Sequence, residues 1–389
     1  MPLPRVYEGC NYLRQRLILS TLSGCPVRIK NIRAKEDTPG IQDFEASFIR
    51  LLDKLTNGSR IEINETGTSL SYHPGLISGG QITHECSLQR GIGYYLEAII
   101  CLAPFSKAPF NVTLHGITNG GDDPSVDVIL KAMLPLFKHF MITEKLDMKV
   151  VHRGAPPNGG GQIVFTCPIV RHLRAASLLK PGRVKRIRGL AYALRMSPAM
   201  GNRVVEGARS VLDKFLKDVY IFTDHHKGAT SGKSPGFGLS LVAETTDGVL
   251  YSVEDSSRPP GTGDITVPED LGQSVARQLV ETVWQGGCVD PRSQSFFLLM
   301  MALSPQDASQ VCLGSLTPYT VEFLRHMKDF LQVVFKIEPL EAYEARQSED
   351  ATPMSIAAAS SAAAGKEGAA LYVLSCKGIG YTNMSKTIR

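Results

Sequence analysis

The stretch Asp43–Leu55, DFEASFIRLLDKL, carries apolar residues three and four positions apart, which predicts an amphipathic helix. Two strand-like runs follow it, SRIEINE (59–65) and TSLSYHP (68–74). The same pattern of a helix followed by strands recurs at Val126–Phe140 (VDVILKAMLPLFKHF), which leads into LDMKVVHRG and GQIVFTCP. It recurs again at Thr320–Leu331 (TVEFLRHMKDFL), which leads into VVFKIEP. The chain therefore contains a repeated unit in which a helix precedes strands.

The spacing of these helices indicates an insertion. They begin near 44, 126 and 320, so the intervals are about 82 and about 194 residues. The longer interval leaves room for an extra domain of roughly 100 residues. We predict an α+β fold in which three repeated α/β units of the βαβαββ type form a large domain, with a small α/β domain inserted before the last unit. The expected bounds are 1–185 and 286–389 for the large domain and 186–285 for the insertion.

The inserted part has its own pattern of elements. It opens with a strand, VKRIRGLAYAL, and continues with a helix over 200–215, the strand-like runs DVYIFTD and GFGLSLVAETTDGVLYSVED, and a helix over 271–283. Nearer the C-terminus, the Ala/Ser-rich segment 348–370 has no strand pattern and is predicted to be a flexible surface insertion. The run LYVLSC should then close the fold as a last strand.

Composition predicts a globular chain in a reducing compartment. Of the 389 residues, 43% are hydrophobic, which is enough to bury substantial cores. None of the eight cysteines lies in a CxxC or other metal-ligand spacing, so free thiols and no metal or cofactor are expected. No run of 18 apolar residues predicts a membrane span, and the N-terminus lacks the apolar core of a signal peptide. The net charge of +5 permits an acidic partner such as RNA without requiring one.

Three segments invite a chemical interpretation and have a structural alternative. Lys227–Gly236 (KGATSGKSPG) resembles a phosphate loop, but its spacing is one residue short and it leads into a strand, which favours a structural hairpin. Asp224, His225 and His226 lack further metal ligands at suitable spacing, which favours solvated loop residues. Asn158–Gly161 predicts a tight turn, with anion binding by its amides as the alternative.

Two basic segments are candidates for contact with a partner. Arg171–Arg188 holds seven Lys and Arg residues and no acid, and both a solvated face and contact with RNA or an acidic protein surface stay open. His326 lies beside Arg325 and Lys328 in a predicted helix. Acid–base catalysis by His326 would need a carboxylate placed by the fold, and a surface helix face is the simpler interpretation.

Several segments resemble the RNA 3'-terminal phosphate cyclase family over most of the chain: LRQRLILSTLSGCPVRIKNIRA, Pro39–Gly40, VTLHGITN and PPNGGGQIVFTCP. The family's fold, three α/β repeats with a small inserted domain, agrees with the spacing described above. The family opens with a glycine-rich EGGGQ loop near the nucleotide, whereas this chain has EGCNY at Glu8–Tyr12. These bulkier residues would deny phosphate a close approach to the backbone. The resemblance keeps Glu8, Arg14 and Arg33. Two guanidiniums repel each other unless a bound anion or a carboxylate lies between them, so we expect a remnant anion site here, and Glu8 as the bridging carboxylate is the alternative.

The position of the family's nucleophile also differs. The family has a histidine, which becomes adenylylated, about eleven residues before a Phe-Leu pair; here that position is Tyr319. A phenol with a pKa near 10 is a poor nucleophile at neutral pH. The resemblance therefore implies that cyclase activity is lost.

The segments GRVKRIRGLAYALRMSPAMGNRVVEGARSVLDKF and CKGIGYTNMSKTIR are most similar to the branch of cyclase-like proteins that act in eukaryotic ribosome assembly. That resemblance implies a nucleolar, non-catalytic assembly factor of the small-subunit processome. It further implies association with the U3 snoRNP and the pre-ribosomal particle, binding to a ribosome-assembly GTPase, and a role in early pre-rRNA processing and 40S subunit formation. Direct contact with pre-rRNA stays open, and the alternative is an endoribonuclease with the helix Arg325–Lys328 at its site. No nuclease-like carboxylate cluster is recognisable, although metal-free cleavage needs only an acid and a base.

The predicted partner surface is basic. Arg325 and Lys328 lie three residues apart and share one helix face, while Phe323, Leu324 and Met327 would pack inward. A second, weaker contact is expected from the cations that follow residue 179, namely Lys180, Arg183, Lys185, Arg186 and Arg188.

Overall fold

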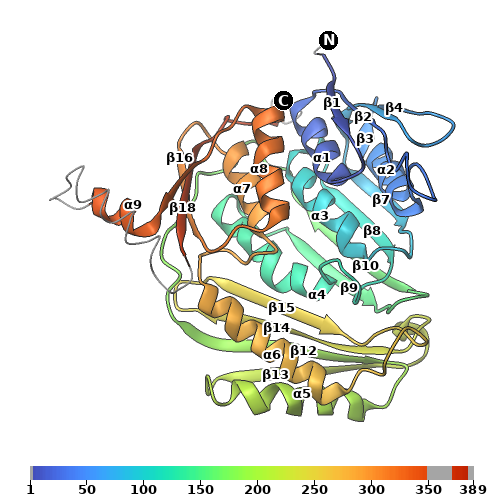
Figure 1. Ribbon diagram of the computed structural model, residues 1–389, viewed down its shortest axis with the longest axis vertical. Coiled ribbons are helices and arrows are strands. Elements are labelled where there is room, and N and C mark those ends of the chain that lie inside the picture. Colours follow the sequence, from blue (N-terminus) through green and yellow to red (C-terminus); the bar gives the residue numbers. More distant parts are fainter. Residues whose placement is uncertain (1–2, 348–369, 384–389) are drawn as a thin grey trace.

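The computed structural model describes residues 3–347 and 370–383, and three of its sheets share one topology. In each of these four-stranded sheets the first strand pairs in parallel with the second, the second in antiparallel with the last, and the last in antiparallel with the remaining strand. Figure 1 shows helices α1, α3, α7 and α8 gathered in the middle of the large domain, with the sheets around them. The predicted α+β fold with repeated units is confirmed.

The first unit places its strands in the order β1-β2-β5-β4. Its elements are β1 (Arg5–Glu8), α1 (Leu13–Ser23), β2 (Val27–Lys30), α2 (Asp43–Leu55), β4 (Arg60–Ile63) and β5 (Leu70–His73), with a short ribbon of β3 (Thr56–Asn57) and β6 (Leu76–Ile77). Helix α2 has the predicted bounds, and its capping box between Gln42 and Glu45 explains why it begins there.

The second unit has the order β7-β8-β10-β9. Its elements are β7 (Gly80–Glu85), α3 (Ile92–Leu102), η1 (Ala103–Phe105), β8 (Phe110–Gly116), α4 (Val126–Val128), η2 (Ile129–Met133), η3 (Leu134–His139), β9 (Asp147–His152) and β10 (Gly161–Cys167). The helix expected over 126–140 is present but irregular, passing from α to π to 3-10 geometry. Pro135 falls in this stretch, and a proline removes a backbone donor and clashes with the preceding turn.

The third unit corrects the predicted position of the insertion. Its elements are β11 (Ser177–Leu178), α7 (Gln294–Leu303), β16 (Ala308–Leu313), α8 (Pro318–Leu331), β17 (Lys336–Pro339), α9 (Leu340–Gln347) and β18 (Tyr372–Lys377). Strand β11 pairs in parallel with β16, as β1 does with β2. The insertion therefore interrupts the last unit after its first strand, and does not precede the unit. A two-residue strand carries too little periodicity to be recognised in sequence. The closing strand is confirmed as β18, whereas 348–369 of the Ala/Ser-rich segment lies outside the described residues.

The insertion forms a fourth sheet in the order β13-β12-β14-β15. Its elements are β12 (Val184–Leu194), α5 (Pro198–Leu212), β13 (Val219–His226), η4 (Gly228–Ser231), β14 (Gly236–Thr245), β15 (Leu250–Ser256) and α6 (Pro268–Gln285). Figure 1 shows α5 and α6 on one side of this sheet and α4 on the other. The loop that resembles a phosphate loop leads into a strand as expected, but it joins β13 to β14 on opposite sides of β12, so it is not a hairpin.

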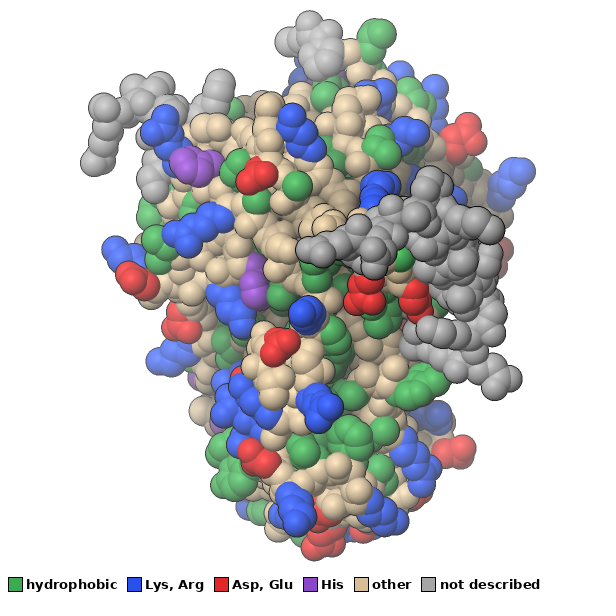
Figure 2. Space-filling view, turned by 90° about the vertical axis from the view of Figure 1, so that its left-hand side faces the viewer, with side chains coloured by type: hydrophobic (Ala, Val, Ile, Leu, Met, Phe, Trp, Pro, Cys, Tyr) green, Lys and Arg blue, Asp and Glu red, His purple; other side chains and the backbone are tan. Residues whose placement is uncertain are grey.

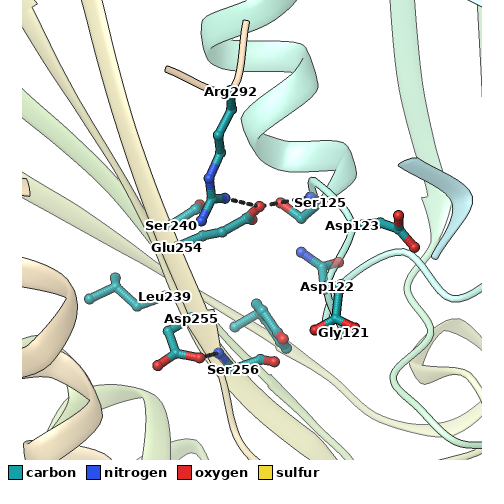
Figure 3. Close-up of a pocket in the computed structure, with 13 residues that line it drawn as sticks. Gly121, Asp122, Asp123, Ser125, Leu239, Ser240, Glu254, Asp255, Ser256 and Arg292 are labelled. Atoms are coloured by element: carbon teal, nitrogen blue, oxygen red, sulfur yellow. Dashed lines mark hydrogen bonds and ion pairs between the residues drawn. The ribbon is translucent and has the colours of Figure 1, made fainter. Parts of the chain in front are cut away.

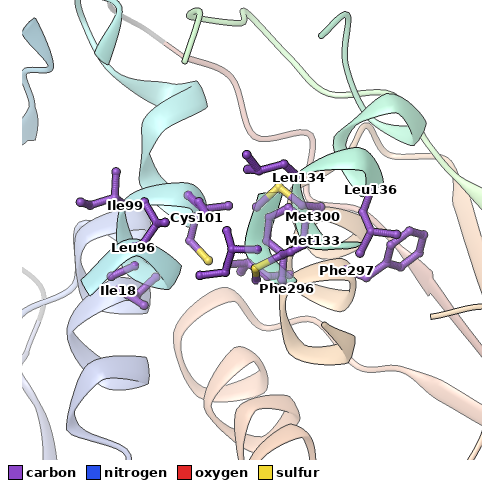
Figure 4. Close-up of a cluster of buried hydrophobic side chains, with 14 of the residues drawn as sticks. Ile18, Leu96, Ile99, Cys101, Met133, Leu134, Leu136, Phe296, Phe297 and Met300 are labelled. Carbon is purple, nitrogen blue, oxygen red and sulfur yellow. The ribbon is translucent and has the colours of Figure 1, made fainter. Parts of the chain in front are cut away.

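The core lies where helices of the three units meet. All ten residues of α7 are buried, as expected for a helix that is apolar on every side. Ile18 of α1, Leu96 of α3, Met133 of η2 and Phe296 of α7 belong to one buried cluster (Figure 4). The ring of Phe137 packs on Phe296 with centroids 4.9 Å apart. No helix among the described residues is long and apolar enough to span a membrane.

Two glycines in the insertion predict opposite effects of one added methyl group. A Cβ on Gly272 of α6 would overlap the Val204 carbonyl oxygen of α5, whereas the nearest atoms to a Cβ on Gly201 are 3.9 Å away. We expect Gly272→Ala to lower the free energy of unfolding by roughly 1–3 kcal/mol, because α5 and α6 must separate. Gly201→Ala should be neutral or stabilising by up to about 1 kcal/mol. Urea denaturation of both variants tests this, and equal effects would contradict the close helix contact.

Candidate functional site

Tyr319 lies in a polar cluster to which all three repeats contribute. Arg14 of α1 forms an ion pair with Glu97 of α3 and donates to the Tyr319 hydroxyl of α8 across 3.0 Å. It also donates to the Tyr94 carbonyl oxygen at 2.8 Å, and its guanidinium lies 4.5 Å from the centroid of the Tyr94 ring. The side chains of Arg14 and Glu97 are only 11% and 14% exposed. This cluster joins the helices of the three units.

The electrostatics of the cluster keep Tyr319 protonated. Burial raises the pKa of the Tyr319 phenol above its ordinary value, and the nearby Arg14 only partly opposes this. Burial likewise raises the pKa of Glu97, again opposed by Arg14. The ring of Tyr12 lies 6.1 Å from the Tyr319 ring. A protonated phenol that accepts a hydrogen bond from Arg14 is a poor nucleophile.

His326 is buried, so its assignment to a surface helix face is wrong. Its side chain is 2% exposed, and Nδ1 lies 2.9 Å from Oε1 of Gln15. Arg16 donates from Nε to Nε2 of His326 over 3.4 Å, which requires a neutral ring protonated at Nδ1. Burial and then Arg16 lower the pKa of His326 to about 4. Helix α1 packs against this side of α8, and the spacing of apolar residues in α8 does not reveal that contact.

The second arginine of the expected anion site lies in a different environment. Arg33 makes a two-pronged contact with Glu45, with N–O distances of 2.7 and 2.9 Å, and donates to the Gly40 carbonyl oxygen at 3.0 Å. Among the described residues, no hydrogen bond or ion pair joins Glu8 to Arg14 or Arg33. The expectation that Glu8 bridges them is therefore wrong: each arginine has its own carboxylate. Anion binding here would require displacement of one of those carboxylates and stays a prediction.

The outer face of α8 agrees with the sequence pattern. Phe323, Met327 and Leu331 are buried, whereas Arg325 and Lys328 are exposed. The side chain of Arg325 is 72% exposed and donates to Glu322 of its own helix at 2.9 Å. Because such an exposed pair within one helix stabilises little, Arg325 is available to a partner.

In the basic run Lys180–Arg188, part of the positive charge is neutralised by carboxylates that the fold brings close. Lys185 and Arg186 both contact Glu244, and Arg188 contacts Asp218. Lys180 and Arg183 are exposed and take part in no ion pair with any described residue. Figure 2 accordingly shows basic side chains scattered over the side of the molecule that carries α9, with acidic ones between them, and no continuous basic surface.

The insertion is fastened to the large domain through buried polar contacts. Glu254 of β15 accepts from the backbone N–H of Ser125, at the start of α4, and from Arg292 (Figure 3). These residues border a cavity of about 60 Å³. Farther along, Arg153 donates to both Asp127 and Asp224 at 2.7 Å. Asp224 is thus an ion-pair residue, and no group of three potential metal ligands occurs among the described residues.

Glu97 and Gln15 were not singled out from the sequence, although a signal existed. Glu97 is the single charged residue within the apolar run IGYYLEAIICL of α3. A lone acid on an otherwise buried helix indicates a paired charge, because an unpaired one would be expensive to desolvate. Its partner Arg14 is 83 residues distant in sequence, and only the packing of α1 on α3 identifies it.

The buried neutral His326 predicts a pH-dependent stability. The unfolded chain binds a proton near pH 6.5 and the folded chain only near pH 4, so the stabilisation is complete above pH 6.5 and is lost as the pH falls toward 4. Lowering the pH from 7 to 5 should reduce the free energy of unfolding of both proteins. The reduction should be about 2 kcal/mol smaller in His326→Asn than in the wild type. Urea denaturation at both pH values measures this difference. Exposed His172→Asn is the control, and an unchanged pH slope in His326→Asn would contradict the assignment.

Comparisons with known proteins agree with this architecture. The family model of the RNA 3'-terminal phosphate cyclase matches residues 5–337. The human RNA 3'-terminal phosphate cyclase-like protein is 55% identical over 384 residues, covering 98% of both chains. A probable cyclase-like protein of Drosophila melanogaster is 47% identical, covering 98% of this chain and 97% of its own. The rRNA processing protein rcl1 of Schizosaccharomyces pombe is 43% identical over 346 residues, covering 88% and 94%. The chain therefore belongs to the RNA 3'-terminal phosphate cyclase family.

Proposed function

We propose that this chain acts in rRNA processing as a non-catalytic assembly factor of the small-subunit processome. The observation that carries the proposal is Tyr319: the family's nucleophile position holds a protonated phenol bound to Arg14. A relative that is 43% identical carries the name rRNA processing protein, which supports the process. The proposed setting is the nucleolus within the nucleus, in association with the U3 snoRNP and the pre-ribosomal particle, during formation of the 40S subunit.

The partner in this proposal is a ribosome-assembly GTPase that contacts α8. Arg325 supports this role because its planar guanidinium is exposed and can form two parallel hydrogen bonds to a carboxylate. Lys328 lies on the same exposed face. Lys180 and Arg183 are the stronger candidates for the second contact, since Lys185, Arg186 and Arg188 already have carboxylate partners.

The alternative, an endoribonuclease at Arg325–Lys328, receives less support. The histidine in that segment is His326, and it is buried with both ring nitrogens engaged by Gln15 and Arg16. A general acid or base must reach the substrate within hydrogen-bond distance. His326 could do so only if α8 moved away from α1.

The first test of the proposal is adenylylation. Incubation of the purified chain with radiolabelled ATP should leave no covalent label, because Tyr319 lacks the nucleophilicity of a histidine and its hydroxyl accepts a hydrogen bond from Arg14. An active cyclase of the same family provides the positive control. A stoichiometric label that is lost in Tyr319→Phe would contradict the proposal.

The second test concerns the GTPase partner. We expect Arg325→Ala to weaken binding by about 2–4 kcal/mol, as for truncation of a buried interface anchor, while the thermal midpoint stays nearly unchanged. Arg60→Ala is a matched control, because Arg60 is 76% exposed and also pairs with a nearby glutamate, Glu62. Calorimetric titration with the purified GTPase measures both variants. Unaltered affinity would remove Arg325 from the interface, and a joint loss of stability would assign it a structural role.

A further inference from the structure

The insertion has one open sheet edge next to a large groove. Strand β13 (Val219–His226) is eight residues long and pairs with β12 along its whole length. It is the terminal strand of its sheet, and within the described part of the chain no strand pairs with its other side. An edge strand presents unpaired N–H and C=O groups to solvent. The strand at the opposite edge, β15, packs against α6, α4 and η2.

The open edge lacks the features that usually protect such strands. It contains neither proline nor lysine, and its pairing with β12 has no bulge. Instead it exposes two large aromatic side chains, Tyr220 and Phe222, which are 55% and 54% exposed. Because strand side chains alternate between faces, both point to the side of the sheet away from α5 and α6. Their rings contact each other with centroids 4.4 Å apart.

The groove beside this edge is partly apolar. Its volume is about 570 Å³, and its sheet wall includes Leu190, Phe222, Val242 and Leu250. Asp127 and Lys131, from the helical segment that begins with α4, line the same groove. The groove thus lies between the sheet of the insertion and the helical segment that begins with α4. Apolar side chains of a bound segment could enter here while its backbone pairs with β13.

The charges around the groove indicate which kind of peptide segment would bind there. Its carboxylates already have basic partners: Asp127 and Asp224 contact Arg153, and Glu244 contacts Lys185 and Arg186. Lys131 and Lys217 are exposed and take part in no ion pair with a described residue. The surplus charge is therefore positive, which favours an acidic segment.

We propose that β13 and the adjoining groove bind an extended segment of a partner protein, with apolar residues at alternate positions and acidic residues between them, as an added β-strand. The observations favour a peptide over single-stranded RNA. The rings of Tyr220 and Phe222 cross at 73°, so the edge of one ring covers a face of the other and the pair forms no flat platform for stacked bases. This surface is separate from α8 and does not depend on the GTPase contact.

Selection from a display library of twelve-residue peptides on the full-length chain tests the proposal. The selected peptides should alternate apolar and acidic residues and should bind the double variant Tyr220→Ser/Phe222→Ser about tenfold more weakly or worse. Trp284→Ser is the matched control, because Trp284 is 67% exposed on α6, which covers the other face of the sheet. Both variants should keep the wild-type thermal midpoint, and Arg325→Ala should keep peptide binding.

Amide hydrogen exchange locates the bound peptide. Binding should slow exchange within Val219–Thr223, where the open edge gains hydrogen-bond partners. The proposal is overturned if no alternating sequence is enriched, if the double variant binds the peptides as well as the wild type does, or if protection appears only elsewhere. It is also overturned in favour of RNA if oligouridylate binds and the double variant abolishes that binding.

Discussion

The ion pair between Arg14 and Glu97 is the constraint around which the large domain is organised. Two opposite charges are largely withdrawn from water between α1 and α3, and the Tyr319 hydroxyl on α8 shares the same guanidinium. A buried charge is tolerable only when its partners are held in place, so the three helices must keep one relative position. Gln15 extends the constraint by donating to the Tyr319 carbonyl oxygen and contacting His326. Each of the three repeats thus depends on polar contacts with the others.

The same arrangement fixes the environment of Tyr319. The hydroxyl oxygen of Tyr319 accepts a hydrogen bond from Arg14, and the Tyr12 ring lies 6.1 Å from the Tyr319 ring. On the same helix, His326 is neutral. What the cluster contributes is therefore stability of the junction between repeats. The surfaces proposed to bind partners, the exposed face of α8 and the open edge of β13, lie outside this cluster.

Polar contacts also decide how the insertion meets the large domain. Arg153 bridges Asp127 of the second unit and Asp224 of β13, and Glu254 caps the start of α4 from β15. The groove that we propose as a docking surface lies between this sheet and the helical segment that begins with α4, next to these contacts.

The sequence by itself determined the features that depend on local periodicity and on substitution at one position. Apolar spacing located α2, α5, α6 and α8, the interval between repeats revealed the insertion, and counting from the Phe-Leu pair identified Tyr319. The two-residue β11 and the irregular helix after Ser125 were beyond such reasoning, because two residues have no period and Pro135 disrupts the local geometry. Only the tertiary structure decided the pairings: Glu97 with Arg14, Glu45 with Arg33, Glu244 with Lys185, and Gln15 with His326. Charge pairing and burial are set by elements that are distant in the chain and adjacent in space, so they depend on packing, which local sequence does not encode.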